Sequence, residues 1–458
     1  MARRKRQSNP FSTGGGGPNF ETRVQAAFAV LMLTNGLVPY LPSWPISKIK
    51  LQGRYAGFNT DDCIIYVRHA DSGQEAKMLA QIRRSVVFAE SNEAFSEVMA
   101  AAWADFNNPD IFKEGIDSIA LITGPLTIED RVAVRPLLEL ARYCENADEF
   151  TGKMDTKGFT SETTRKKLAI IQSQLKSMND GRDVDPDRLW RFLESFHIVW
   201  YDLDSESGST LSLLKSLLAQ NTSGNTADAM WSQILEHVQS ADQNAGTITL
   251  ESIPKGLRCF SGELVGNWAS DLEKLRSHGE YILSSIQSDI GGVHVPRVKL
   301  LHDIMELTEK SGLILISGGR GDGKSTLAKE FVKSAGTEYP VFCLRTEELG
   351  LPHLDHVLRA IGISSSLSGL ASGFAMMPKR YLLIESLEKL LELRCKSAFK
   401  DLANFILNNP GWIVIATLRD YSYPQITRNL LPRDLSWSSL TVPEFDDDDL
   451  GDREEDAT

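Results

Sequence analysis

Residues 313–325 join an apolar run to a glycine-rich turn and a lysine, a combination of residue types that binds phosphate. The run LILIS leads directly into GGRGDGKS, which has the spacing Gly-x-x-x-x-Gly-Lys-Ser. Its glycines let backbone N–H groups point inward around the phosphates, the lysine places a positive charge beside the β and γ phosphates, and the serine hydroxyl binds Mg²⁺. The strand-like segment before the turn and the helix-forming STLAKEFVKSA after it are the setting that this motif requires. We therefore predict a nucleoside triphosphate site, with Ser325 as a Mg²⁺ ligand, formed by Gly318, Gly319, Arg320, Gly321, Asp322, Gly323, Lys324, Ser325 and Thr326.

Two later strand-like segments end in residues suited to the same site. The segment YLLIES ends at Glu385, where an acid binds Mg²⁺ through water or positions the attacking water. A surface glutamate is the alternative, and Glu388 is expected on a solvated helix face. The segment WIVIATLRDYS carries Thr417 and Arg419 to the same edge, where Arg419 would sense the γ-phosphate or, alternatively, form a surface ion pair. The Asn-Lys-x-Asp pattern that reads guanine does not follow, so ATP is favoured over GTP.

A second group of polar residues lies in the amino-terminal half. Glu21 belongs to the helix-forming run FETRVQAAFAVLML and is expected to begin that helix, while Asp61 and Asp62 precede the strand-like CIIYV. Gln81 and Arg83 follow in KMLAQIR, where the two-residue period of a strand puts both on one face.

The layout of these five residues matches metal-dependent nucleases of the PD-(D/E)XK type. In such sites acids on adjacent strands hold Mg²⁺, and a lysine two residues after the second ligand orients or deprotonates water. Arg83 occupies the lysine position, and because arginine stays protonated it cannot act as a base, although it can stabilise the charge of the phosphorane. The alternative is that Asp61 and Asp62 form a turn and Gln81 faces solvent.

Hydrophobic periodicity predicts an α/β protein with two main domains. Strands are expected at IKLQG, CIIYV, KMLAQIR, IDSIALITG and FHIVWYDL, and later at 339–344, 381–384 and 412–416, with a helix through 387–408 between the last two. Strands that alternate with helices in this way imply a parallel, doubly wound sheet in the second domain. The expected organisation is a basic, glycine-rich flexible start (1–18), a nuclease-like α/β domain (19–210), a helical connector (211–290), a P-loop NTPase domain (291–443) and an acidic, disordered tail (444–458).

Composition is that of a cytosolic globular protein. The 458 residues are 42% hydrophobic and 24% charged, and no run of eighteen apolar residues exists, so neither a membrane span nor a secretory signal is expected. The five cysteines are scattered without a CxxC pair and are expected to be free thiols. The net charge of −12 is concentrated at the end, where EFDDDDLGDREEDAT holds nine acids and one arginine, so it does not argue against contact with nucleic acid elsewhere.

Taken together, the motifs resemble bacterial anti-phage proteins of the Avs (antiviral STAND NTPase) type. The front half is similar to their DNA-endonuclease domain in the runs GGGGPNFETRVQAAFAVLML, GFNTDDCIIYV, AQIRRSV and AAWADFNNPDIFKEGIDSIALITG. The back half is similar to their NTPase segments in GGRGDGKSTLAKEF, YLLIESLEKLLE and WIVIATLRDYS.

The resemblance implies an antiviral defence effector in which an ATP-dependent, homo-oligomerising module gates a Mg²⁺-dependent nuclease that acts on double-stranded DNA. It implies that Asp62 and Gln81 belong to the nuclease metal site and that the family's lysine falls on Arg83. Family members continue into a helical lid and a repeat array that recognises a phage protein, whereas this sequence stops at an acidic tail. Recognition is therefore expected to reside in a separate sensor protein, or the chain is a shortened relative.

The sequence is compatible with two interpretations of the amino-terminal half. In the first, the chain is a P-loop ATPase and a DNA endonuclease. In the second, the nuclease-like domain has lost cleavage because of Arg83 and serves as a DNA-binding or scaffolding module beside an ATP switch. A stand-alone ATPase of unrelated purpose is the third reading, and it predicts no association with DNA even at low salt.

Overall fold

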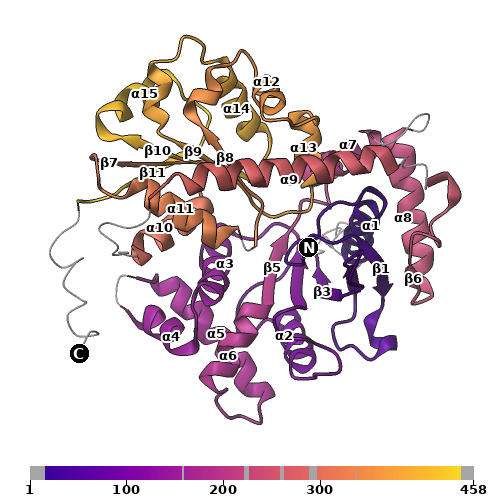
Figure 1. The fold of residues 1–458 in the computed structure, drawn as a ribbon. Coiled ribbons are helices and arrows are strands. Elements are labelled where there is room, and N and C mark those ends of the chain that lie inside the picture. The colour runs from indigo at the N-terminus through magenta and orange to yellow at the C-terminus, as the bar shows by residue number, and fades with distance from the viewer. Residues whose placement is uncertain are drawn as a thin grey trace, which may run out of the picture. The chain divides into compact units, whose positions relative to one another are not determined.

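The computed structural model describes residues 16–156, 159–220, 226–257, 262–287, 297–336 and 338–444. The chain divides into two compact units (Figure 1), the first made of Met1–Val265 with Ser372–Met376 and the second of Gly266–Ala371 with Met377–Thr458. The predicted glycine-rich start up to residue 15, the acidic tail from residue 445 and Cys259 lie outside the described residues.

The first unit contains α1 (Gly16–Thr34), β1 (Ile46–Leu51), η2 (Gly53–Ala56), β2 (Cys63–Arg68), β3 (Glu75–Arg83), α2 (Glu93–Phe106), β4 (Ser118–Thr123), α3 (Ile128–Tyr143), α4 (Ala147–Asp155), α5 (Glu162–Met178), α6 (Pro186–Ser195), β5 (Phe196–Trp200), α7 (Ser209–Gln220), α8 (Ala227–Gln243), β6 (Thr247–Ile248) and η3 (Lys255–Leu257). Helix α9 (Gly262–Ser284) begins in this unit and continues into the second.

The second unit contains α10 (Val298–Thr308), β7 (Leu313–Gly318), α11 (Lys324–Ala335), β8 (Val341–Arg345), η4 (Thr346–Gly350), α12 (Leu354–Ala360), α13 (Leu367–Gly373), β9 (Arg380–Glu385), η5 (Leu387–Leu391), α14 (Ser397–Asn408), β10 (Trp412–Arg419), η6 (Asp420–Ser422), α15 (Tyr423–Asn429) and β11 (Trp437–Thr441). The last two residues of α13 fall in the segment assigned to the first unit.

The first unit is built on a six-stranded mixed sheet in the order β5-β4-β3-β2-β1-β6. Strands β3, β4 and β5 are parallel, while β1, β2 and β6 join by antiparallel pairing. Alternate residues face opposite sides: Cys63 and Ile65 pack with apolar residues of α1, α7 and α8, whereas Ile64 and Leu79 pack with those of α2, α3 and α5. Helices therefore cover both faces of this sheet, and the fold is mixed α/β.

Most of the stretch predicted as a helical connector belongs to the first unit. Leu214 of α7 and Trp231 and Val238 of α8 are buried in the same core as α1, and Ile248 of β6 pairs with Ile49 of β1. Helix α8 consequently reaches the face of the sheet on which α1 lies.

A short segment from late in the chain completes this core. Ser372–Met376 is grouped with the first unit, and Ala375 and Met376 are buried in the core that α1, α7 and α8 share. The hydroxyl of Tyr201 donates a hydrogen bond to the carbonyl of Met376 at 2.7 Å. The first unit is thus assembled from two separate parts of the sequence.

A buried carboxylate fixes the loop that precedes β2. Asp105 of α2 is fully buried, and its oxygens accept hydrogen bonds from the backbone N–H groups of Asn59 and Thr60 at 2.8 and 2.7 Å and from the Asn59 side chain at 2.9 Å. Because this loop ends at Asp61 and Asp62, Asp105 sets the position from which both carboxylates project.

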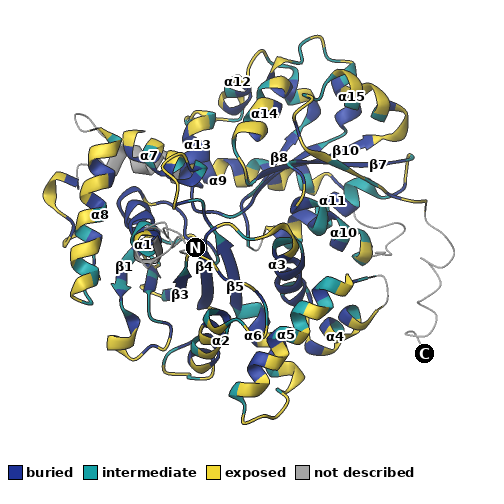
Figure 2. Cartoon of the chain, turned by 180° about the vertical axis from the view of Figure 1, so that it is seen from behind, coloured by how far each residue is buried: buried dark blue, intermediate teal, exposed yellow. Residues whose placement is uncertain are grey.

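The second unit is built on a five-stranded sheet in the order β11-β7-β10-β9-β8. Every adjacent pair is parallel. The interior strands β7, β9 and β10 are buried nearly throughout and appear dark blue in Figure 2, as expected for strands covered on both faces, while the edge strand β11 is partly exposed. Figure 1 shows α10 and α11 on one face of this sheet and α12 and α14 on the other. The predicted parallel sheet is present.

Three local predictions differ from the structure. The helix expected through 387–408 is interrupted: after Ser386, which has a left-handed conformation (φ 58°), the chain forms η5 as far as Leu391, and α14 begins only at Ser397. Helix α1 begins before Glu21, at Gly16. Strand β11 was not expected, because WSSLT lacks an apolar run.

Replacing Asp105 with alanine should destabilise the first unit by about 3 kcal/mol, because the buried N–H of Thr60 and the partly buried N–H of Asn59 would lose a charged acceptor. Urea unfolding followed by circular dichroism measures the change. Asp110→Ala, which removes an exposed carboxylate of the same segment, should leave the midpoint within about 0.5 kcal/mol. Equal midpoints for the two variants would show that Asp105 does not hold the loop.

Candidate functional site

The glycine-rich turn of the second unit has the geometry of a phosphate-binding loop. It connects β7 to the first residue of α11, so the helix N-terminus points its free N–H groups into the turn. Gly321 and Gly323 have φ values of 96° and 83°, which only glycine adopts without strain. A Cβ on Gly318 would lie 2.9 Å from both the Asp322 carboxylate and the carbonyl of Val442. The glycine spacing read from the sequence is therefore required by the backbone.

Side chains of the loop differ in their hydrogen bonding and in their burial. Lys324 donates a hydrogen bond from Nζ to the carbonyl of Gly319 and so spans the loop that it belongs to. Asp322 is buried, with its carboxylate against Gly318 and Gly319, whereas Arg320 is exposed.

The residues after the lysine lie at the start of α11. Ser325 is half-buried, and its hydroxyl is the group that binds Mg²⁺ in motifs of this kind. The hydroxyl of Thr326 donates to the carbonyl of Gln287 at 3.1 Å, and Lys329 donates to the carbonyl of Ile286 at 2.6 Å. The chain after α9 is thereby tied to the first turn of α11.

Strand order brings the other predicted residues to the same edge of the sheet. Strand β10 lies between β7 and β9, and its register places Arg419 level with Gly318. On its other side, the hydroxyl oxygen of Thr417 accepts a hydrogen bond from the backbone N–H of Ser386 at 2.9 Å, one residue after Glu385. The ends of three strands thus meet beside the glycine-rich turn.

Arg419 has a partner that the sequence did not indicate. Its Nε lies 3.4 Å from Oε1 of Glu388, whose side chain is only 9% exposed. The expectation that Glu388 lies on a solvated helix face is wrong, because η5 replaces the predicted helix at this point and turns Glu388 inward.

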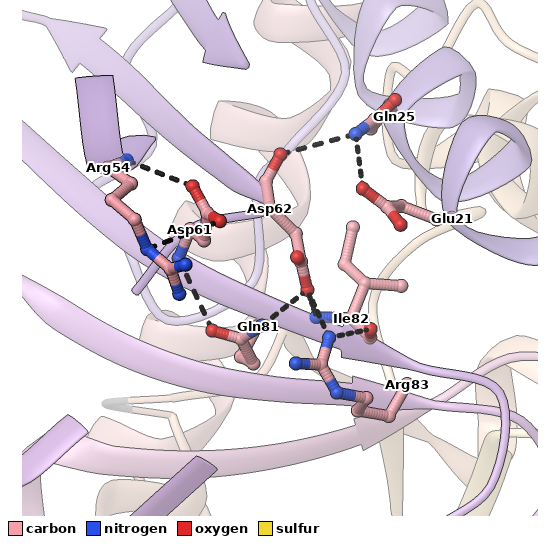
Figure 3. Close-up of polar contacts among 8 residues, drawn as sticks. All are labelled: Glu21, Gln25, Arg54, Asp61, Asp62, Gln81, Ile82 and Arg83. Atoms are coloured by element: carbon pink, nitrogen blue, oxygen red, sulfur yellow. Dashed lines mark hydrogen bonds and ion pairs between the residues drawn. The ribbon is translucent and has the colours of Figure 1, made fainter. Parts of the chain in front are cut away.

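The nuclease-like residues gather at one end of β2 and β3 in the first unit (Figure 3). Oδ2 of Asp62 accepts hydrogen bonds from Nε2 of Gln81 at 2.7 Å, from the backbone N–H of Ile82 at 2.5 Å and from Arg83 at 2.9 Å. Gln81 and Arg83 therefore project on one face, as their spacing implied. The alternative that Gln81 faces solvent is wrong, because Gln81 is buried.

Glu21 reaches the same place from α1 through a fully buried glutamine. Nε2 of Gln25 donates to Oε1 of Glu21 and to the carbonyl of Asp62, each at 3.2 Å. Burial, followed by the charge of Asp62, raises the pKa of Glu21 to about 8. Burial also raises the pKa of Asp62 to about 6, against the opposing effect of Arg83. The carboxyl groups of Glu21 and Asp62 are thus poorly solvated, and a nearby positive charge would stabilise their ionised forms.

Two further acids border this cluster. Asp61 turns toward Arg54: its Oδ1 accepts from the Arg54 backbone N–H at 3.0 Å, and its Oδ2 lies 3.6 Å from the guanidinium. Asp242 of α8 lies close enough to contribute to the raised pKa values of Glu21 and Asp62. Burial raises the pKa of Asp242 itself. Gln25 and Asp242 were missed by sequence reasoning, although Gln25 lies one helical turn after Glu21, which is a detectable signal.

The donor set at Asp62 fits a divalent cation only in part. Oδ1 of Asp62 accepts no hydrogen bond from the described residues, and carboxylate oxygens of Asp62 and Glu21 are ligands that Mg²⁺ prefers. Gln81, however, turns its oxygen toward the N–H of Asp61 at 3.3 Å and presents N–H to Asp62. No group of three or more His, Cys, Asp or Glu suited to a metal occurs within the described residues. Gln81 would have to rotate its amide to bind a cation, and Arg83 supplies the positive charge instead.

Comparison with known proteins yields only distant likenesses. No model of a known family matches the sequence, and no curated protein matches it. A Cap4 SAVED/CARF-domain containing receptor from Acinetobacter baumannii is similar with a TM-score of 0.30 and 9% identity, over 87% of this chain and 94% of that chain. The Hsp104–ADP complex of S. cerevisiae gives a TM-score of 0.20 at 10% identity, over 80% of this chain and 70% of that chain. Likenesses of this size carry no functional argument, which must rest on the residues themselves.

Two other features bear on the setting. No helix in the described ranges has the length and hydropathy to span a bilayer. The four cysteines within those ranges, Cys63, Cys144, Cys343 and Cys395, are free thiols, as predicted.

Replacing Thr417 with valine should destabilise the second unit by about 1–3 kcal/mol, because the N–H of Ser386 loses its acceptor while the side chain keeps its shape. Chemical denaturation reports the change. If valine is tolerated without loss, the contact between β10 and the turn after β9 contributes nothing to stability.

Proposed function

We propose that this chain is an ATP-binding defence protein in which the second unit switches the action of the first on double-stranded DNA. The observation that carries the proposal is the glycine-rich turn between β7 and α11, with Lys324 across it and the ends of β9 and β10 beside it. The role in defence against phage, the homo-oligomer and a separate sensor or phage-protein trigger follow from the sequence resemblance to Avs-type proteins.

ATP fits the residues of the loop. Inward backbone N–H groups and the N-terminus of α11 would bind the phosphates, Lys324 would leave the Gly319 carbonyl for the β and γ phosphates, and Ser325 with Glu385 would hold Mg²⁺. Arg419, level with Gly318, would contact the γ-phosphate. Assembly of ATP-bound chains would bring the first units of several copies onto one DNA duplex. We propose that this clustering switches on their action on DNA.

The action proposed for the first unit is hydrolysis of DNA phosphodiester bonds. Mg²⁺, when bound, would polarise the phosphate and supply an activated water. Within the chain, Asp62 and Glu21 would hold that positive charge, and Arg83 would pair with the developing negative charge on phosphorus oxygens. Arg83 cannot accept a proton, so the proton of the attacking water must pass to a carboxylate or to solvent.

One observation favours the second candidate, a DNA-binding or scaffolding module that does not cut. Three N–H donors, including the Arg83 guanidinium, converge on a single oxygen of Asp62. A carboxylate paired in this way must lose a cationic partner before it binds a metal, which opposes cleavage.

Lys324→Ala should abolish nucleotide binding and nucleotide-dependent assembly, because the charge beside the phosphates is lost. Fluorescent ATP titration and light scattering measure the two effects. Lys333→Ala, at an exposed position of the same helix, should behave like the wild type. Unchanged assembly of Lys324→Ala on addition of ATP would remove the switch from the proposal.

The two candidate actions are separated by plasmid cleavage with Mg²⁺, ATP and any activating partner. Cleavage by the wild type that disappears in Asp62→Ala and on removal of Mg²⁺ by EDTA supports the nuclease. An inactive wild type that gains cleavage as Arg83→Lys indicates a decayed site, since lysine can lose a proton and arginine cannot. Retention of DNA at low salt without cleavage in either form supports the scaffold, and no retention at all contradicts both.

A further inference from the structure

The end of β10 carries an arginine whose guanidinium is held from one side only. Arg419 is level with Gly318, the first residue of the phosphate loop. Its Nε lies 3.4 Å from Oε1 of Glu388, and its side chain is 47% exposed. Among the described residues, its guanidinium forms no hydrogen bond, and Glu388 is the one residue with which it forms an ion pair. The fork of N–H groups that binds phosphate is therefore available, while the Nε side is paired.

The carboxylate of Glu388 is less well solvated and less completely hydrogen-bonded than a surface carboxylate. Its side chain is 9% exposed, and Oε2 is buried without a hydrogen-bond partner in the described part of the chain. A buried, incompletely paired carboxylate costs free energy, so its presence is not explained by stability.

The backbone that presents Glu388 is also constrained. Ser386, two residues earlier, has a left-handed conformation (φ 58°), and its N–H is fixed by Thr417 of β10. Two contacts, Ser386 with Thr417 and Glu388 with Arg419, thus join the turn after β9 to the end of β10. Strained backbone of this kind is common at ligand sites, where the surrounding structure holds it in place.

We propose that Glu388 is a positioning residue: it orients Arg419 toward the γ-phosphate and thereby makes the site prefer ATP to ADP. A carboxylate on Nε leaves both terminal nitrogens for bidentate contact with phosphate oxygens, which a freely rotating arginine would meet less often. This role rests on the proposed nucleotide site. It adds a residue that neither the loop motif nor the strand-end pattern contains.

The test compares the dissociation constants of ATP and ADP for full-length variants by titration calorimetry. Arg419→Ala should weaken ATP binding roughly tenfold, the loss expected for one charged phosphate contact, and leave ADP binding unchanged. Glu388→Ala should reproduce that loss, and the double variant should be no weaker than either, because both changes remove one interaction. Glu388→Gln, which keeps an acceptor oxygen for Nε, should fall between Glu388→Ala and the wild type.

A matched control lies on the neighbouring segment. Glu347 pairs with Lys389 of η5 at 2.6 Å and is half-exposed, so Glu347→Ala removes the same charge nearby without touching Arg419. It should leave the ATP to ADP ratio unchanged. Denaturation midpoints should show no loss of stability in Glu388→Ala, since an incompletely paired buried carboxylate is removed; a purely structural residue would lower the midpoint and weaken both nucleotides equally.

The outcomes separate this inference from the function on which it rests. Failure of the wild type to bind either nucleotide overturns the proposed function itself. A wild type that prefers ATP, with a Glu388→Ala variant that prefers it equally, overturns only the role of Glu388. Tighter ATP binding by Glu388→Ala would show that the carboxylate competes with the phosphate for Arg419, which is the opposite of the proposal.

Discussion

The register of β10 between β7 and β9 is the constraint on which the second unit depends. Parallel strands end at a common edge, so one pairing places Arg419 beside Gly318 and Thr417 beside the turn that follows Glu385. A shift of one residue along β10 would turn both side chains to the opposite face of the sheet. The buried, almost continuously apolar sequence of β10 permits such pairing from either face, and the hydrogen bond from Ser386 to Thr417 is one contact that distinguishes the observed register from its neighbours.

In the first unit the governing interaction is electrostatic. Asp62 and Glu21 are held where water solvates them poorly, and Arg83 with the backbone N–H of Ile82 compensates the charge of Asp62. Asp105 fixes the loop before β2 by accepting hydrogen bonds from the backbone N–H groups of Asn59 and Thr60. Substituting lysine for arginine at position 83 would keep the charge but would lose the planar guanidinium with its several N–H donors. The two residues would therefore give sites of different chemistry on the same backbone.

Sequence reasoning reached the parts of the fold that local pattern determines. Period-two alternation placed Gln81 and Arg83 together, and the glycine spacing located the turn between β7 and α11, because both are properties of a few consecutive residues. It placed Glu388 wrongly, on a solvated helix face, and it did not find Asp242. The inward position of Glu388 depends on η5, which follows the left-handed Ser386 in place of the predicted helix, and the position of Asp242 depends on α8 folding back onto the sheet across a long stretch of chain. Neither event has a signature within a short window, since each is decided by tertiary packing.

The contribution of Ser372–Met376 to the first unit has a consequence for biosynthesis. Ala375 and Met376 fill the core that α1, α7 and α8 share, and Tyr201 is bonded to the Met376 carbonyl. A nascent polypeptide that has emerged only as far as Val265 therefore lacks part of its own interior. At ribosomal speeds of about 5–20 residues per second, the wait until Met376 appears is on the order of ten seconds, during which apolar surface stays uncovered. The first unit can therefore complete its core only after the ribosome has translated the chain as far as Met376.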